Sequence, residues 1–191
     1  MIKQQTEGSI QKELRSYFQN GYNYQISNAF IFGIDWESDF FCVNREGWAF
    51  EFEIKVSRSD FKADLKKKRH QILLSGSSDP KWNANYTGRV KNFIPNRFYY
   101  VVPKGLITLA ELPEYAGLIE VENYLNFTKR APFIHKRKLE LRKTLCDKFF
   151  HRYLEQRRKS ALMEFDYKQL QKRLTTLKEK YPKEFIEINN Y

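Results

Sequence analysis

The chain has 191 residues, of which 41% are hydrophobic and 16% are aromatic. This length and composition suffice for one ordinary hydrophobic core. They exclude intrinsic disorder and two domains that each have a hydrophobic core of ordinary size. Two cysteines without a CxxC pairing and three histidines exclude a disulfide framework and a zinc-finger site. Because the N-terminus is polar and no apolar run approaches the ~20 residues of a membrane span, we expect a soluble, cytoplasmic protein without a membrane partner.

The net charge is +11, from 34 Lys and Arg against 23 Asp and Glu. Residues 128–183 hold 18 of the basic and 6 of the acidic side chains, whereas residues 1–127 hold 16 and 15. This division predicts a core at 1–131 that carries specific chemistry. It also predicts a helical extension at 132–191 that supplies general affinity for a polyanion.

The hydrophobic pattern predicts an α/β protein. Apolar residues recur at helical spacing near both ends of the chain, and they alternate with polar residues in between. The predicted elements are a helix at 6–18, a β-hairpin between 30 and 56 with its turn at 44–47, a basic helix at 61–74, buried strands at 98–102 and 117–121, and helical structure from 136 to 181.

The predicted hairpin carries an acidic face. With the turn centred at Glu46, Asp39 lies opposite Glu53 and Glu37 lies opposite Lys55, with paired Cβ atoms roughly 5 Å apart. Like charges at that distance destabilise a sheet, and a Mg²⁺ ion held by hard oxygen ligands reverses that effect. The alternative is a solvent-exposed acidic sheet face on which Lys55 is a neutralising partner.

A family resemblance rests on the same residues. Asp39, followed after the turn by Glu53-Ile54-Lys55, resembles the motif of the PD-(D/E)XK nuclease superfamily, although Ser38 stands where proline is common. Three further stretches are similar to MmcB-like DNA repair proteins and related phage or mobile-element nucleases. They are EIKVSRSDFKAD at 53–64, NRFYYVVP at 96–103, and the segment 112–119.

The resemblance implies a restriction-endonuclease-like core, in which a helix, a mixed sheet with the catalytic hairpin, a second helix and further strands follow one another. It implies a DNA endonuclease that uses Mg²⁺, with Mn²⁺ as a substitute, in DNA repair or phage DNA processing. Asp39, Glu53 and the carbonyl of Ile54 would hold the metal, and a protonated Lys55 would orient the attacking water. The alternative is a catalytically silent DNA-binding accessory protein of the same fold.

Members of the superfamily often add a carboxylate from the first helix. Glu7 is our candidate, because it shares the stripe of Ile10, Leu14 and Phe18 that is predicted to face the core. The alternative is that Glu7 only interacts favourably with the helix dipole.

The residues after the motif are the predicted DNA contacts, because they are basic or polar and follow the catalytic strand directly. Capping of the next helix by Ser59 and Asp60, a solvated helix face and a structural role for His70 are the alternatives. The predicted nucleic-acid-binding residues are Ser57, Arg58, Lys62, Lys66, Lys68, Arg69 and His70.

The C-terminal helical segment contains a heptad seam with 4-3-4-3-4 spacing. The seam predicts either a homodimer through the C-terminal helices or packing of the helix against the core. The basic residues of the segment predict salt-dependent binding of DNA, and a role in RNA or protein binding is the alternative. The seam residues are Met163, Tyr167, Leu170, Leu174, Leu177 and Tyr181.

Overall fold

The chain forms two compact units, Met1–Arg142 and Lys143–Tyr191. The predicted domain boundary, between residues 131 and 132, lies before this division. Residues after 131 still belong to the first unit, and one reason is that the backbone N–H of Ile134 donates a hydrogen bond to the carbonyl of Asn96 at 2.9 Å. The computed structural model describes residues 5–32, 36–75, 94–136, 138–139 and 141–180.

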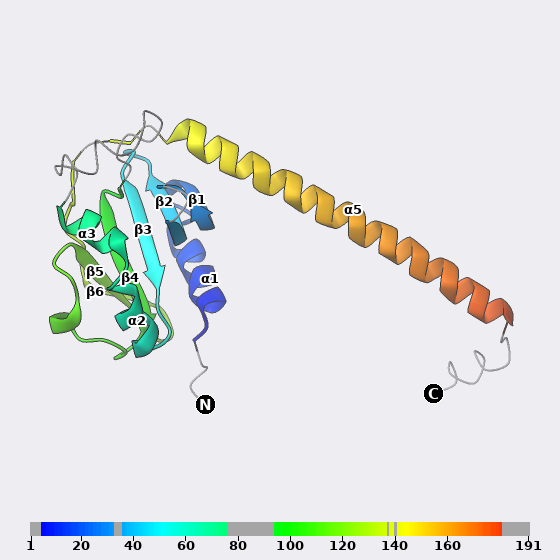
Figure 1. Cartoon of the computed structure of the whole chain (residues 1–191), viewed down its shortest axis with the longest axis horizontal. Coiled ribbons are helices and arrows are strands. Elements are labelled where there is room, and N and C mark those ends of the chain that lie inside the picture. The colour runs from blue at the N-terminus through cyan, green and yellow to red at the C-terminus, as the bar shows by residue number, and fades with distance from the viewer. Residues whose placement is uncertain (1–4, 33–35, 76–93, 137, 140, 181–191) are drawn as a thin grey trace. The chain divides into compact units, whose positions relative to one another are not determined.

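The first unit is built on one mixed six-stranded sheet whose strands lie in chain order (Figure 1). The second strand is antiparallel to the first and to the third. The third, fourth and fifth strands are parallel, and the sixth is antiparallel to the fifth. The predicted α/β class is therefore confirmed. The strands are β1 (Tyr22–Phe30), β2 (Glu37–Asn44), β3 (Ala49–Ile54), β4 (Arg97–Pro103), β5 (Ala116–Val121) and β6 (Leu125–Lys129).

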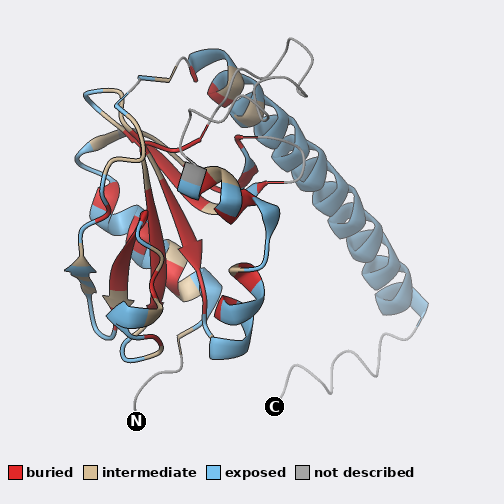
Figure 2. Cartoon of the chain, turned by 60° about the vertical axis from the view of Figure 1, so that its left-hand side comes forward, coloured by how far each residue is buried: buried red, intermediate tan, exposed pale blue. Residues whose placement is uncertain are grey.

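Helices cover both faces of this sheet. Helix α1 (Glu7–Phe18) lies on one face, and the short helices α2 (Arg58–Asp64) and α3 (Lys68–Ser75) lie on the other. A short 3₁₀ helix spans Leu109–Glu111 between β4 and β5. Because both faces are covered, the central strands are buried along most of their length (Figure 2).

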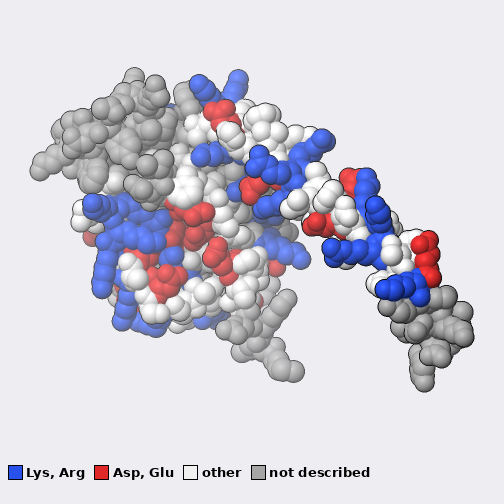
Figure 3. Space-filling view, turned by 45° about the vertical axis from the view of Figure 1, so that its right-hand side comes forward, with Lys and Arg blue, Asp and Glu red and all other residues white. Residues whose placement is uncertain are grey.

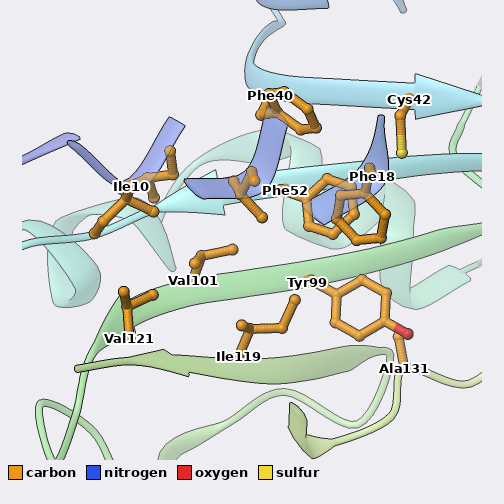
Figure 4. Close-up of a cluster of buried hydrophobic side chains, with 12 residues drawn as sticks. Ile10, Phe18, Phe40, Cys42, Phe52, Tyr99, Val101, Ile119, Val121 and Ala131 are labelled. Carbon is orange, nitrogen blue, oxygen red and sulfur yellow. The ribbon is translucent and has the colours of Figure 1, made fainter. Parts of the chain in front are cut away.

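The main hydrophobic cluster lies between α1 and the sheet (Figure 4). Helix α1 begins with a capping box at Thr6, and its residues Ile10, Leu14 and Phe18 are buried, as the sequence predicts. Phe18 packs beside Phe52 of β3, with ring centroids 5.0 Å apart. The side chains that point from the strands toward α1 are those of the even-numbered hairpin positions, which was the predicted core face.

The hairpin of β2 and β3 has the predicted register. Phe40 pairs with Phe52 and Phe41 pairs with Glu51, so the next positions outward are Asp39 and Glu53. The turn is fixed by the side chain of Asn44, which accepts a hydrogen bond from the backbone of Trp48 at 2.9 Å. Gly47 has a φ of +86°, which glycine adopts without strain.

Two predicted element boundaries are wrong. The strand predicted from Phe30 onward begins at Glu37 as β2, whereas Phe30 is the last residue of β1; positions 33–35 of the predicted strand lie outside the described residues. The predicted helix at 61–74 is divided into α2 and α3, because the backbone after Asp64 makes short-range turn bonds instead of helical ones. Lys66 N–H donates to the Ala63 carbonyl and Lys67 N–H to the Asp64 carbonyl. Strand β6 and all of β1 except Phe30 were not predicted.

The second unit contains the helix α5 (Arg142–Lys180), and the predicted C-terminal helical structure is confirmed over this range. All side chains at 149–180 are exposed, including those of the heptad seam up to Leu177; Tyr181 lies outside the described residues. Basic side chains are spread along α5 and are interspersed with acidic ones (Figure 3). Neither α5 nor any other helix that the structure describes combines the length and apolar composition of a membrane span.

Candidate metal and nucleic-acid site

Asp39, Glu53 and Lys55 meet where β2 and β3 end. The carboxylate of Asp39 accepts a hydrogen bond from the backbone N–H of Ile54 at 2.7 Å. The ammonium of Lys55 lies 2.6 Å from Glu53 Oε1 and 4.0 Å from Asp39 Oδ2. The backbone of Lys55 is held by the Val101 carbonyl of β4, at 3.0 Å. We call Asp39, Glu53 and Lys55 the motif trio.

The motif trio lies under α2 and α3, away from bulk solvent. Glu53 is 2% exposed and Lys55 is 5% exposed, while Asp39 is partly exposed. A solvent-exposed acidic sheet face, which was the alternative interpretation of the hairpin, is therefore excluded. Buried charges need partners, because their desolvation otherwise costs several kcal/mol.

Those partners come from α2 and α3. Glu53 is paired with Lys55 and also with the guanidinium of Arg69. Arg69 Nη2 donates to Asp64 Oδ1 at 2.6 Å, and Asp64 lies 3.9 Å from Lys55. We call Glu53, Lys55, Asp64 and Arg69 the ion network.

Asp64 is fully buried and was not among the predicted site residues. Its carboxylate also accepts a hydrogen bond from the hydroxyl of Tyr100 at 2.9 Å and lies 2.7 Å from Lys67 Nζ. Although burial raises the pKa of Asp64, a hydrogen bond from His70 and the neighbouring cations hold it well below its ordinary value. A sequence signal existed: Asp64 is three residues after Phe61, so both lie on the buried face of α2.

Arg69 and His70, two of the predicted nucleic-acid contacts, are buried and do not lie on an exposed face of α3. They are 8% and 4% exposed, respectively. His70 Nε2 lies 2.9 Å from Asp64 Oδ2, and its Nδ1 is paired with the hydroxyl of Tyr115. The break between α2 and α3 turns both side chains toward the sheet, and His70 has the structural role that was its alternative.

Glu51 is a third buried carboxyl on the same face of β3, two residues before Glu53. Trp36 Nε1 donates to its Oε1 at 2.6 Å and the hydroxyl of Ser38 does so at 3.0 Å. Burial raises the pKa of Glu51 to about 8, so the carboxyl is largely neutral at pH 7. It was not predicted, because alternation alone does not distinguish a buried from an exposed glutamate.

The electrostatics of the motif trio differ from residue to residue. Burial, followed by the charge of Glu53, raises the pKa of Asp39 to about 7. Burial lowers the pKa of Lys55, but the carboxylates of Glu53, Asp64 and Asp39 raise it by more, so it lies above its ordinary value. Lys55 is therefore protonated and positively charged at neutral pH.

The donor set of the site fits a hard divalent cation. Glu53 Oε2 is buried and has no hydrogen-bond partner among the described residues. Asp39 is close enough for the charge of Glu53 to raise its pKa, which is the arrangement that a cation relieves. Within the described ranges, no three His, Cys, Asp or Glu side chains are grouped so that they could hold a metal ion. The resemblance implies that a Mg²⁺ here would be held by two carboxylates, Asp39 and Glu53, and by the carbonyl of Ile54.

Glu7 lies at the edge of the site. Its side chain is exposed, so the prediction that it faces the core is wrong. Gln11 Nε2 donates both to Glu7 Oε1 at 2.9 Å and to the carbonyl of Asp39 at 3.1 Å. Glu7 thus approaches the motif trio through Gln11, from the first turn of α1.

The other predicted nucleic-acid contacts lie around α2 and α3. Ser57 is the N-cap of α2 and accepts from the backbone of Asp60, so the cap is neither Ser59 nor Asp60. Arg58 donates to the carbonyl of Leu106 at 2.8 Å. The exposed members of the group are Arg58, Lys62, Lys66 and Lys68.

Comparison with known proteins gives a fold-level likeness. No family model and no curated protein matches the chain. A solved structure, the protein SPO1766 of unknown function from Silicibacter pomeroyi, is similar with 23% sequence identity and a TM-score of 0.50. The match covers 82% of this chain and 88% of that one. The likeness concerns the fold alone.

Proposed function

We propose that the protein is a metal-dependent phosphodiesterase that cuts DNA. More specifically, it is a Mg²⁺-dependent DNA endonuclease of the PD-(D/E)XK type, in which Mn²⁺ substitutes. The observation that carries the proposal is the convergence of Asp39, Glu53 and Lys55 at the end of one hairpin, with two carboxylates beside a buried ammonium. Folding alone gives little reason for that arrangement.

The residues of the motif trio divide the work. Asp39, Glu53 and the Ile54 carbonyl would hold the metal, which when bound would lower the pKa of a water and stabilise charge on the scissile phosphate. Lys55 orients the attacking water and offsets the negative charge that develops in the transition state. Asp64 and Arg69 keep Lys55 and Glu53 in place, so we assign them positioning roles.

The architecture supports a restriction-endonuclease-like core. Its order of α1, the β2–β3 hairpin, α2 with α3, and further strands is the order that the superfamily uses. A DNA substrate is supported by the exposed Lys62, Lys66 and Lys68 next to the site. DNA repair or phage DNA processing is the setting that the resemblance to MmcB-like proteins suggests.

A cleavage assay tests the proposal. Purified protein is incubated with supercoiled plasmid and with duplex, single-stranded, flap and four-way DNA, in the presence of Mg²⁺, Mn²⁺ or EDTA. We expect metal-dependent cleavage that Lys55→Ala reduces by about 10²-fold or more. Lys104→Ala is the matched control, because Lys104 is exposed and its carboxylate partner, Glu122, lies outside the site. Absence of cleavage of every substrate by the wild type refutes the enzyme.

One observation favours the silent accessory protein as a second candidate. Glu53 is already paired with both Lys55 and Arg69, and a metal has to compete with these two cations. The accessory protein predicts salt-sensitive DNA binding that Asp39→Asn leaves intact, with no turnover in any divalent metal.

A further inference from the structure

A pocket of about 790 Å³ lies in the first unit, on the α1 side of the sheet. It is bounded by the C-terminal end of α1, the β2–β3 turn, the first residue of β4 and the segment after β6. Phe50 and Phe52 contribute to its wall, and their side chains point to the opposite face of β3 from Glu53. The pocket is therefore separate from the motif trio.

Aromatic side chains form much of the wall. The rings of Trp48 and Phe133 meet edge to face with centroids 5.2 Å apart. Tyr22 and Phe50 meet in the same way at 5.5 Å. Such rings are surfaces on which a nucleobase stacks.

The same wall carries an excess of positive charge. Arg97, Arg130 and Lys136 line the pocket, and Glu46 is the acidic residue of the described lining. Glu46 accepts a hydrogen bond from Trp48 Nε1 at 3.1 Å, so its carboxylate is engaged at the turn. The three cations and one carboxylate leave a net charge of +2 for an anionic ligand.

Arg97 joins the two features. Its guanidinium carbon lies 4.1 Å from the centroid of the Phe133 ring, so the side chain packs against the aromatic wall. Its Nε is buried and has no hydrogen-bond partner among the described residues. A buried donor without a partner destabilises the protein, and a phosphate oxygen at this position would accept its hydrogen bond and remove that cost.

We propose that this pocket binds a nucleotide, with the base against the rings of Trp48 and Phe133 and the phosphate at Arg97, Arg130 and Lys136. The ligand class is a deoxynucleoside monophosphate. It is either free or the phosphorylated end of a DNA strand, since both present one base and one terminal phosphate. The pocket does not depend on the proposed nuclease, because it shares no residue with the motif trio.

Calorimetric titration of the full chain in EDTA tests the proposal, because EDTA removes metal-dependent binding at the motif trio. The probes are dAMP, deoxyadenosine, inorganic phosphate, and a single-stranded oligonucleotide with and without a 5′-phosphate. We expect dAMP to bind with a Kd below about 1 mM and more tightly than deoxyadenosine or phosphate alone. If the phosphorylated oligonucleotide binds more tightly than both dAMP and its unphosphorylated form, the source is a strand end.

Arg97→Gln is expected to weaken dAMP binding about tenfold or more. Arg130→Gln is a second variant, because its exposed side chain is not needed for folding, and it decides the matter if Arg97→Gln unfolds. Lys104→Gln and Lys55→Ala are controls and retain wild-type affinity. Absence of dAMP binding to the wild type, or equal binding by wild type and Arg130→Gln, overturns the proposal. Loss of cleavage in Lys55→Ala with dAMP binding retained separates it from the nuclease.

Discussion

Asp39 carries an energetic cost in the folded protein. Its pKa is raised from 3.8 to about 7 by burial and by Glu53, so the folded state holds its proton more tightly than the unfolded state does. The stability that the protonated carboxyl contributes is present below pH 4 and is lost as the pH rises through about 7. The same carboxyl must be ionised to hold a metal.

We predict that Asp39→Asn stabilises the metal-free protein at high pH. The neutral amide avoids the cost of a buried charge, so the free energy of unfolding should rise by about 1–3 kcal/mol at pH 8.5 and change little at pH 4. Urea unfolding at both pH values measures the difference. Equal effects at both pH values would show that the charge of Asp39 is not the cause.

We also predict that metal binding depends on pH through the same group. Because a proton and the metal compete for Asp39, the affinity for Mn²⁺ should rise by up to about tenfold per pH unit below pH 7 and level off above it. Titration calorimetry between pH 5.5 and 8.5 measures this. Asp39→Asn removes the pH-dependent part, and a flat profile in the wild type would exclude Asp39 as a ligand.

Arg69 stabilises the folded protein, because its buried guanidinium pairs with two buried carboxylates. Its removal leaves Glu53 and Asp64 as buried carboxylates with one fewer cation. We predict that Arg69→Ala lowers the free energy of unfolding by about 3–5 kcal/mol. The exposed Lys62→Ala should change it by less than about 0.5 kcal/mol. Urea unfolding at pH 7 compares the two, and similar losses would contradict the buried ion network.

At the scale of elements, sequence reasoning succeeded where the pattern is local. The alternation of apolar and polar residues, together with the turn at Asn44 and Gly47, was sufficient for the register that brings Asp39 to Glu53. The residues from Tyr22 to Ser27 also alternate, but their strand was missed because the alternation breaks at Asn28, which is exposed and has a φ of +50°.

The ion network could not be predicted, because it depends on the break between α2 and α3. In a continuous helix Asp64 and Arg69, five residues apart, would point about 140° away from each other. The turn between the helices lets both side chains reach Glu53 and each other. A pattern read as one uninterrupted helix therefore assigns Arg69 to the solvent.

The heptad seam of α5 leads to a prediction of its own. Leu170 belongs to the seam and is 62% exposed, whereas Leu162 lies off the seam and is 63% exposed. If α5 pairs with a second copy, Leu170→Lys should convert a dimer into a monomer of 23.1 kDa, and Leu162→Lys should not. Sedimentation equilibrium measures the mass. A monomeric wild type at about 100 μM would exclude the homodimer.

For the whole molecule, the position of the boundary changes where the positive charge belongs. The first unit has 22 basic and 16 acidic residues, and the second has 12 and 7, so the units carry +6 and +5. The basic excess that begins near residue 128 thus continues through the last part of the first unit, which includes Arg130 and Lys136 of the pocket. Both units, and not the helix alone, are expected to attract a polyanion.

The length of helix α5 limits the length of DNA that it can contact. Its 39 residues rise by about 1.5 Å each, which gives a rod of about 58 Å. Duplex DNA advances about 3.4 Å per base pair, so the rod matches about 17 base pairs. If its basic side chains lie along a duplex, the length of the helix limits how many base pairs it contacts. Affinity should then grow with the length of the DNA up to that size and change little beyond it.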